Sequence, residues 1–316
     1  MFDSQILNQN FIRLDRRKFL GIASGLIAAG VLPRSALALA GPHSFKQGVY
    51  DLTVVSDGTL ELPLAIVSPD AKPEELKALM GAAANGDKFN PEVNVVLAKS
   101  GNDVILFDTG AGPGMTATAG KLGESLKAAG TDPASITKVI YTHAHPDHLF
   151  GTVGADGKPV FANATFHMSE AEHNFWAAPD LASKMPKEME GMVKGIQGQL
   201  SVINEKFSFF KPGAEVVSGI LAIDTAGHTP GHISFEIAGG DGLILTGDAI
   251  AVPSVFFAHP EWKFGFDADG ATAGANRRKL LDMAASAKKQ MLGYHWAYPG
   301  LGRAEAKDGA FIYVAG

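Results

Sequence analysis

Residues 141–151 read YTHAHPDHLFG and place four potential metal ligands within six positions. These ligands are His143, His145, Asp147 and His148. Because alternate side chains of an extended segment share one face, His143 and His145 can converge on one ion. Pro146 then turns the chain, so that Asp147 and His148 can bind or position a second ion. The stretch follows an apolar run and therefore predicts a metal site at the end of a β-strand.

The alternative is that these are ordinary histidines of the core or the surface, which is the usual origin of a single histidine. Three histidines and an aspartate with this spacing favour a metal site instead. The sequence contains no cysteine, so every protein ligand must be an imidazole, a carboxylate or a backbone atom. Such a set suits zinc, with Mn, Fe or Co as alternatives. A net charge of −6 gives no reason to expect nucleic-acid binding.

The first forty residues predict an export signal rather than part of the fold. Arg16 and Arg17 precede the apolar run 21–32, which is short for a membrane span but typical of a signal peptide. We expect cleavage after Ala40, leaving a domain of residues 41–316 that has no stable membrane insertion; the A-x-A site at 36–38 and an uncleaved anchor are alternatives. The twin-arginine export machinery is then a partner, and the enzyme is expected in the periplasm.

Apolar strands that end in a potential ligand recur later in the chain. The run 221–225 leads to His228, the run 243–246 to Asp248 and the run 291–294 to His295. Because strand ends at one edge of a sheet can converge, we expect these three side chains to join the first cluster. His232, the second histidine of the AGHTPGH motif, is expected to pack behind the ligands.

Several other segments carry local structural signals. The SDG sequence at 56–58 predicts a turn between strands at 50–55 and 60–67, and the runs 93–98 and 104–107 predict a second hairpin. Asp108, in a strand-to-glycine turn, is expected to support a histidine ligand from behind.

Ser169 is expected to cap a helix, with Glu172 at the spacing of a capping box. The chain divides into two similar halves of strand–strand–helix character. This division predicts two sheets packed face to face with helices outside.

The series HxHxDH, AGHTPGH, TGD and a late histidine resembles the metallo-β-lactamase fold superfamily over residues 48–314. The resemblance implies an α+β fold, a four-layer αβ/βα sandwich, with two divalent metal ions, most simply zinc. It implies that His143, His145 and His228 hold one ion, that Asp147, His148 and His295 hold the other, and that Asp248 bridges both. A hydroxide between the ions is the expected nucleophile, with Asp147 and Asp248 as catalytic residues.

Within the superfamily, the segments 56–59, 108–111, 227–232 and 295–302 are most similar to methyl parathion hydrolase-like enzymes. This resemblance implies a small phosphotriester, ester or lactone substrate and a homodimer. The residues expected to line a substrate pocket are Met115, Phe150, Trp176, Met192, Ala251 and Phe256, and the hydrophobic core is an equally favoured alternative for Trp176 and Phe256. Only Trp176 matches the aromatic cage of the phosphotriesterase, so the predicted pocket is apolar but less aromatic.

Two alternative functions are considered, one a different hydrolase and the other not an enzyme. Acyl homoserine lactonases commonly place a tyrosine three positions after the bridging aspartate, where this chain has Ala251, so a lactonase ranks second. A periplasmic protein that binds or stores zinc is the alternative outside enzymes. Turnover of an ester that is lost on chelation separates a hydrolase from a storage protein.

Overall fold

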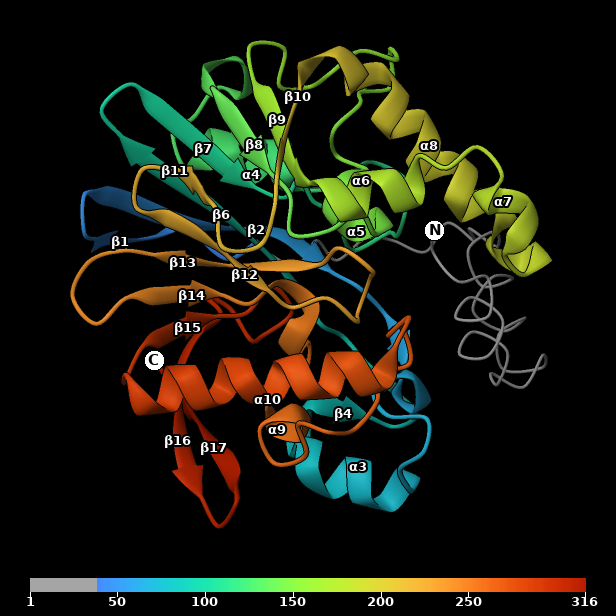
Figure 1. Cartoon of the computed structure of the whole chain (residues 1–316), viewed down its shortest axis with the longest axis vertical. Coiled ribbons are helices and arrows are strands. Elements are labelled where there is room, and N and C mark those ends of the chain that lie inside the picture. The colour runs from blue at the N-terminus through green and yellow to red at the C-terminus, as the bar shows by residue number, and fades with distance from the viewer. Residues whose placement is uncertain (1–38) are drawn as a thin grey trace.

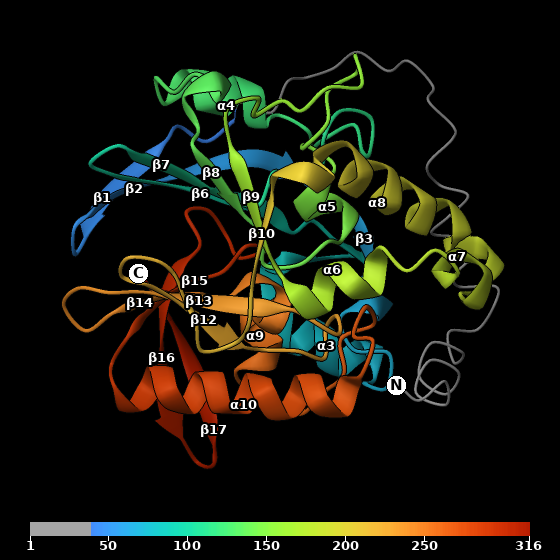
Figure 2. The same cartoon turned by 45° about the horizontal axis from the view of Figure 1, so that its top comes forward.

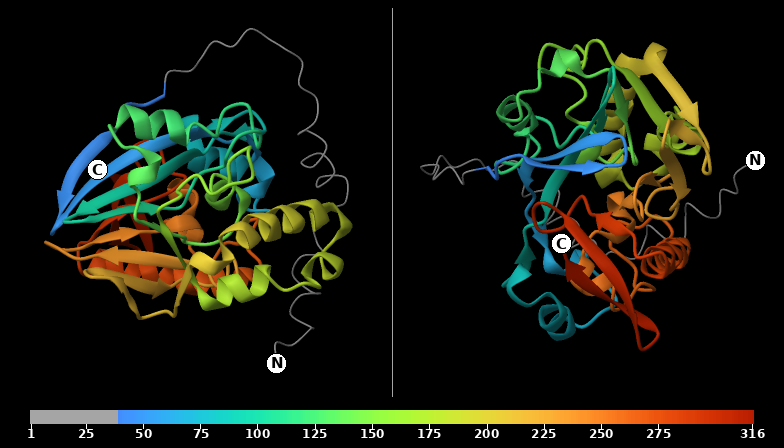
Figure 3. Two further views of the ribbon diagram at one scale, coloured as in Figure 1. Left: turned by 90° about the horizontal axis from the view of Figure 1, so that it is seen from above. Right: turned by 90° about the vertical axis from the view of Figure 1, so that its left-hand side faces the viewer.

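A computed structural model of the chain describes residues 39–316, and they form two seven-stranded β-sheets packed face to face (Figure 1). Helices cover the outer face of each sheet, and the long helices α8 and α10 lie on opposite sides of the sandwich (Figures 2 and 3). Helix α8 spans Glu190–Ile203 and α10 spans Gly270–Ser286. The arrangement confirms the predicted four-layer sandwich.

The first sheet has the strand order β1-β2-β6-β7-β8-β9-β10. Its strands are β1 His43–Gln47, β2 Tyr50–Thr59, β6 Glu92–Ser100, β7 Asp103–Phe107, β8 Lys138–Ile140, β9 Thr165–Ser169 and β10 Phe207–Phe210. Strands β6 and β7 form the predicted hairpin, whereas β7, β8, β9 and β10 run parallel. The carboxyl ends of the parallel strands therefore meet at one edge, where β8 leads into His143.

The second sheet has the order β11-β12-β13-β14-β15-β16-β17. Its strands are β11 Glu215–Val217, β12 Ile220–Asp224, β13 Ile233–Ile237, β14 Leu243–Leu245, β15 Gln290–Leu292, β16 Leu301–Lys307 and β17 Ala310–Ala315. Strand β13 is antiparallel to both β12 and β14, and β14 is parallel to β15. The ends of β12, β14 and β15 thus share an edge, which brings His228, Asp248 and His295 together.

The face between the sheets is filled by apolar side chains that alternate along the strands. Phe235 of β13 is fully buried there, and its ring lies 5.5 Å from that of Phe107 and 5.9 Å from that of Phe210. Two further apolar clusters lie on the outer faces of the sheets: one between the first sheet and its helices, and one between the second sheet and its helices. The packed sheets make a rigid base from which the loops of the site project.

Shorter helices and a small sheet complete the fold. The helices are α3 Pro73–Met80, α4 Leu122–Ala128, α5 Pro146–Leu149, α6 Glu170–Trp176, α7 Leu181–Lys184 and α9 Pro253–Phe256. The small sheet has β5 Lys88–Phe89 between β3 Leu62–Pro63 and β4 Ala84–Asn85. Helix α10 begins where the Asp269 carboxylate accepts hydrogen bonds from the backbone N–H groups of Ala271 and Thr272.

The predicted hairpin of residues 50–67 is wrong. Strand β2 continues through the SDG sequence and pairs with β1 and β6, while residues 64–66 form a 3₁₀ turn. Asp57 is buried, and its carboxylate accepts hydrogen bonds from the N–H groups of Ala111, Gly120 and Leu122. The SDG sequence is therefore an irregular part of a strand rather than an exposed turn. The hydrogen bonds of its buried carboxylate come from a loop that is distant in sequence.

The predicted signal segment of residues 1–40 falls almost entirely outside the described residues, so export and cleavage after Ala40 stay predictions. Between residues 39 and 316, no helix combines the length and the apolar character that crossing a bilayer requires.

Candidate metal centre

The first ligands lie where β8 ends and the short helix α5 begins. Pro146 occupies the first turn of α5, where its missing N–H costs no hydrogen bond. His143 and His145 precede it in the loop, with the backbone of His145 extended, and Asp147 and His148 sit on the helix itself. The proline thus separates two ligands on the loop from two on the helix, as the sequence predicts.

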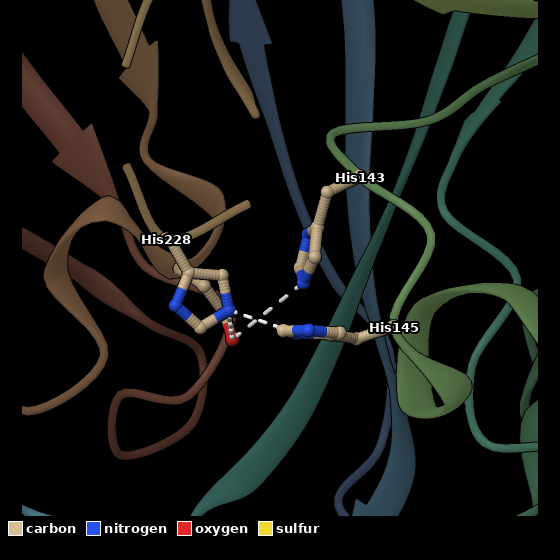
Figure 4. A group of neighbouring side chains, drawn as sticks. His143, His145 and His228 are labelled. Carbon is tan, nitrogen blue, oxygen red and sulfur yellow. Dashed lines mark hydrogen bonds and ion pairs between the residues drawn. The ribbon is translucent and has the colours of Figure 1, made fainter. Parts of the chain in front are cut away.

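The first group of ligand side chains consists of His143, His145, His228 and Asp248. Their ligand atoms all lie within 4.8 Å of one another, and the three imidazoles point toward one another (Figure 4). His228 Nε2 lies 2.9 Å from His145 Nδ1 and 3.3 Å from Asp248 Oδ2. His143 Nε2 lies 3.9 Å from the same carboxylate oxygen.

The second group consists of Asp147, His148 and His295. Asp147 Oδ2 lies 3.2 Å from His295 Nε2 and 3.5 Å from His148 Nε2. The other oxygen of Asp248, Oδ1, lies 3.2 Å from His148 Nε2 and 3.3 Å from His295 Nε2. Asp248 therefore turns one oxygen to each group, which is the geometry of a carboxylate shared between two ions.

Three atoms of this cluster are buried without a hydrogen-bond partner: His143 Nε2, His148 Nε2 and Asp248 Oδ1. Buried polar atoms in proteins nearly always have a partner. Imidazole nitrogens and carboxylate oxygens that face one another in this way fit divalent cations. The structure thus brings all seven predicted ligands into a site suited to two metal ions.

In the absence of a metal ion, burial and neighbouring charges shift the pKa values of the histidine ligands strongly. Burial lowers the pKa of His145 to about 3, and His228 beside it acts in the same direction. Burial also opposes the charge of His148, but the carboxylates of Asp248, Asp147 and Asp108 raise its pKa well above the ordinary value. His228 and His295 are likewise raised, to about 9 and about 10, by their carboxylate neighbours. The concentrated negative charge would favour a divalent cation, and binding of that cation would displace these protons.

Groups behind the ligands hold them in orientation. Asp108 Oδ2 lies 2.8 Å from His148 Nδ1, and both oxygens of Asp108 accept hydrogen bonds from Thr142. His295 Nδ1 lies 2.8 Å from the carbonyl oxygen of Glu92. Each contact leaves the Nε2 atom of the ring free for a metal. The predicted support by Asp108 is therefore present and acts on His148.

His232 is also buried behind the ligands, where the Asp248 N–H donates to its Nε2 atom. Thr225 Oγ1 lies 2.8 Å from its other ring nitrogen. Both nitrogens are therefore engaged, and His232 fixes the backbone at Asp248 as expected of a packing residue.

We expect Asp108→Asn to weaken zinc binding about 10–100-fold, because such partners of ligating histidines typically contribute that much. An amide group donating to His148 Nδ1 would place the imidazole proton on Nε2, the atom that faces the metal. Competition with a coloured chelator measures the affinity. Asp103→Asn, at the surface-facing start of β7, is the control; equal affinities in both variants would contradict the role of Asp108.

Two residues that support the ligands were not predicted from the sequence, Glu172 and Asp267. Glu172 is not part of a capping box, since Ser169 makes no side-chain cap and the Glu172 carboxylate is buried among four donors. Asp267 Oδ1 lies 3.1 Å from His228 Nδ1, and its other oxygen pairs with Arg277. Asp267 lies in a loop without a recognisable motif, so no local signal marks it.

The predicted pocket residues divide into two sets. Met115, Phe150 and Met192 are partly exposed and pack against the apolar cluster of the first sheet. Ala251 and Phe256 are buried in the cluster of the second sheet, with Phe256 0% exposed under the Arg277 guanidinium. The placement of Ala251 and Phe256 in an open pocket is therefore corrected: both belong to the core.

Trp176 is also buried, and its ring meets His145 edge-on at 5.8 Å. A cavity of about 490 Å³ lies elsewhere, between the start of α3 and the loop before α10. Lys72, Glu75 and Trp262 are among its lining residues, and none of the seven predicted ligands lines it. The cavity is therefore not the predicted active site.

The fold and the site together define a metal-dependent hydrolase. Residues 91–289 match the family model described as the metallo-beta-lactamase superfamily, and the chain belongs to that superfamily. The chain is similar to the structure of AidC, a dizinc quorum-quenching lactonase, with 30% identity and a TM-score of 0.82 over 88% of this chain and 98% of that one. Membership and this neighbour favour an enzyme over a zinc-storage protein.

Two further relatives agree with this assignment. The hydrolase AbOPH in the beta lactamase superfamily is 29% identical, with a TM-score of 0.81 over 88% of this chain and 98% of that one. The N-acyl homoserine lactonase AttM of Agrobacterium fabrum is 30% identical over 131 residues, which are 40% of this chain and 46% of that protein. The chain thus spans less than half of AttM but nearly all of AidC and AbOPH.

Proposed function

We propose that this protein hydrolyses lactones at a dinuclear zinc centre. The observation that carries the proposal is the likeness to a dizinc lactonase over nearly the whole of both chains. The seven ligand side chains support it, since Asp248 faces both halves of the centre with one oxygen each. An imidazole and carboxylate donor set without thiolates is compatible with zinc.

Two bound divalent ions supply a nucleophile from water at neutral pH and polarise the carbonyl group of a lactone. The protein contributes orientation. Asp147 is 8% exposed and His295 is 9% exposed, and His145 of the other group is also partly exposed, so both halves of the site have a side that faces solvent. Burial acts against the charge of Asp147, but His148 and His295 hold its pKa below the ordinary value. An ionised carboxylate there would help to hold a metal ion and would orient the water that attacks the substrate.

Met115, Phe150 and Met192, which are partly exposed beside the apolar cluster of the first sheet, would be the side chains to meet the acyl part of a substrate. The narrower likeness to methyl parathion hydrolase has less support. Trp176, the one residue that matches the aromatic cage, is buried and donates its indole N–H to Glu172. Ala251, which stands where acyl homoserine lactonases commonly have a tyrosine, weighs less against a lactonase, because AidC and AttM, to which the chain is similar, are both lactonases by name.

A substrate panel tests the proposal. The zinc-loaded protein is expected to hydrolyse acyl homoserine lactones faster than aryl esters or aryl phosphotriesters at equal concentration. Chelation should reduce the rate at least about 100-fold, since the ions provide both nucleophile and Lewis acid, and added zinc should restore it. Turnover of phosphotriesters with no turnover of any lactone would overturn the substrate assignment while leaving the metal centre intact.

A further inference from the structure

Glu172 is a buried carboxylate on α6 that is not one of the seven predicted metal ligands. Its side chain is 0% exposed, and all four of its close polar neighbours are hydrogen-bond donors. Three of them, the N–H groups of Ala144, Gly231 and Trp176, can only donate, so a carboxylate that accepts from all four suits the site better than a protonated carboxyl group, whose hydrogen could go only to the Thr229 hydroxyl. Burial raises the pKa of Glu172, and the four hydrogen bonds act against that rise.

The two oxygens of Glu172 reach two different ligand loops. Oε1 accepts from the backbone N–H of Ala144 at 2.9 Å, between the ligands His143 and His145. Oε2 accepts from Thr229 Oγ1 at 2.7 Å and from the Gly231 N–H at 3.0 Å, in the loop that follows His228. One carboxylate thereby joins the loop from the first sheet to the loop from the second sheet.

Two further contacts make this connection tight. A Cβ atom at Gly231 would lie 2.1 Å from the backbone nitrogen of Glu172, so this loop packs directly against the start of α6. Trp176, one turn further along α6, donates to Glu172 Oε1 at 2.7 Å and places its ring edge-on to His145. The helix, the two loops and the imidazole of His145 therefore form one packed unit.

We propose that Glu172 is a positioning residue that sets the spacing between the loops carrying His143, His145 and His228, and so determines how tightly that half of the centre binds its metal. The inference rests on the proposed dinuclear centre but not on the identity of the substrate. His148 and His295 have their own supports in Asp108 and the Glu92 carbonyl group. Loss of Glu172 should therefore affect one half of the centre more than the other.

Metal titration of the stripped full chain tests the inference. For Glu172→Gln we expect one of two zinc ions to bind about 10–100-fold more weakly, while the other keeps its affinity within a few-fold. Glu172→Asp keeps the charge but is one methylene shorter, so it should show a similar loss if spacing is what matters. Glu170→Gln removes an exposed carboxylate from the same helix and serves as the matched control.

The cobalt-substituted proteins provide a readout that a general loss of stability would not give. A changed arrangement of His143, His145 and His228 should shift the visible absorption bands of one cobalt ion in Glu172→Gln but not in Glu170→Gln. If Glu172→Gln fails to fold, Thr229→Val removes a single hydrogen bond to Oε2 and should give a smaller change of the same kind.

Wild-type affinity for both ions in Glu172→Gln, with unchanged cobalt bands, would overturn the inference. Equal weakening of both ions would also overturn it, because the effect would then not belong to one half. A wild-type protein that binds two ions but opens no lactone would refute the proposed substrate and leave this test unaffected.

Discussion

Asp248→Ala is expected to lower lactone hydrolysis by about a thousand-fold or more, equivalent to roughly 4 kcal/mol of activation free energy. The reason is the position of its carboxylate, with Oδ2 3.3 Å from His228 Nε2 and Oδ1 3.2 Å from His148 Nε2. Without it, both halves of the centre would lose a negatively charged ligand, and no carboxylate would be left to be shared by two ions. Steady-state rates and metal content per chain, measured on the same samples, report the effect.

Asp241→Ala is the control for this prediction. Asp241 is exposed in the turn before β14, the strand that leads to Asp248, and its side chain lies outside both ligand groups. We expect its rate and metal content to equal those of the wild type. Full activity in Asp248→Ala with two bound ions would show that the carboxylate is not shared in the way the geometry indicates.

Arg277→Met is expected to cost about 3–5 kcal/mol of unfolding free energy, because it leaves the buried carboxylate of Asp267 without its charged partner. The guanidinium is 0% exposed and lies 3.2 Å from Asp267 Oδ2. It also donates to the carbonyl groups of Ala249, Pro260 and Trp262. Urea denaturation of the metal-free protein measures the loss without a contribution from bound ions.

The neighbouring arginine provides the matched control for Arg277→Met. Arg278 is partly exposed, and its guanidinium lies 3.6 Å from the Glu261 carboxylate. Arg278→Met should cost less than about 1 kcal/mol, as is usual for exposed ion pairs. Similar losses in the two variants would contradict the distinct role of the buried pair. Arg277→Met should also weaken zinc binding, since Asp267 holds His228 at 3.1 Å.

The ligand residues and the sandwich could be predicted because each ligand lies in a short motif directly after an apolar strand. His143 follows β8, and Asp248 and His295 follow the parallel strands β14 and β15. Parallel neighbours end at the same edge, so local sequence and sheet geometry together bring distant residues to one place.

The residues that hold the ligands could not be predicted in the same way. Glu172 had the spacing of a helix cap, yet its carboxylate accepts hydrogen bonds from two loops that lie far from it in sequence. Asp57 lies in a sequence typical of a turn, but it belongs to β2, and N–H groups of a distant loop donate hydrogen bonds to its carboxylate. Phe256 had the position of a pocket residue and is covered by Arg277. In each case long-range packing decided the outcome.

The number of metal ions bound per chain is the most direct test of the central claim. Elemental analysis of the purified protein, after loosely bound metal is removed by gel filtration, should find two zinc ions per chain. Chelation should remove both ions together with hydrolytic activity, and two equivalents of zinc should restore it. Full activity with one ion or none would contradict a dinuclear centre built from His143, His145, Asp147, His148, His228, Asp248 and His295.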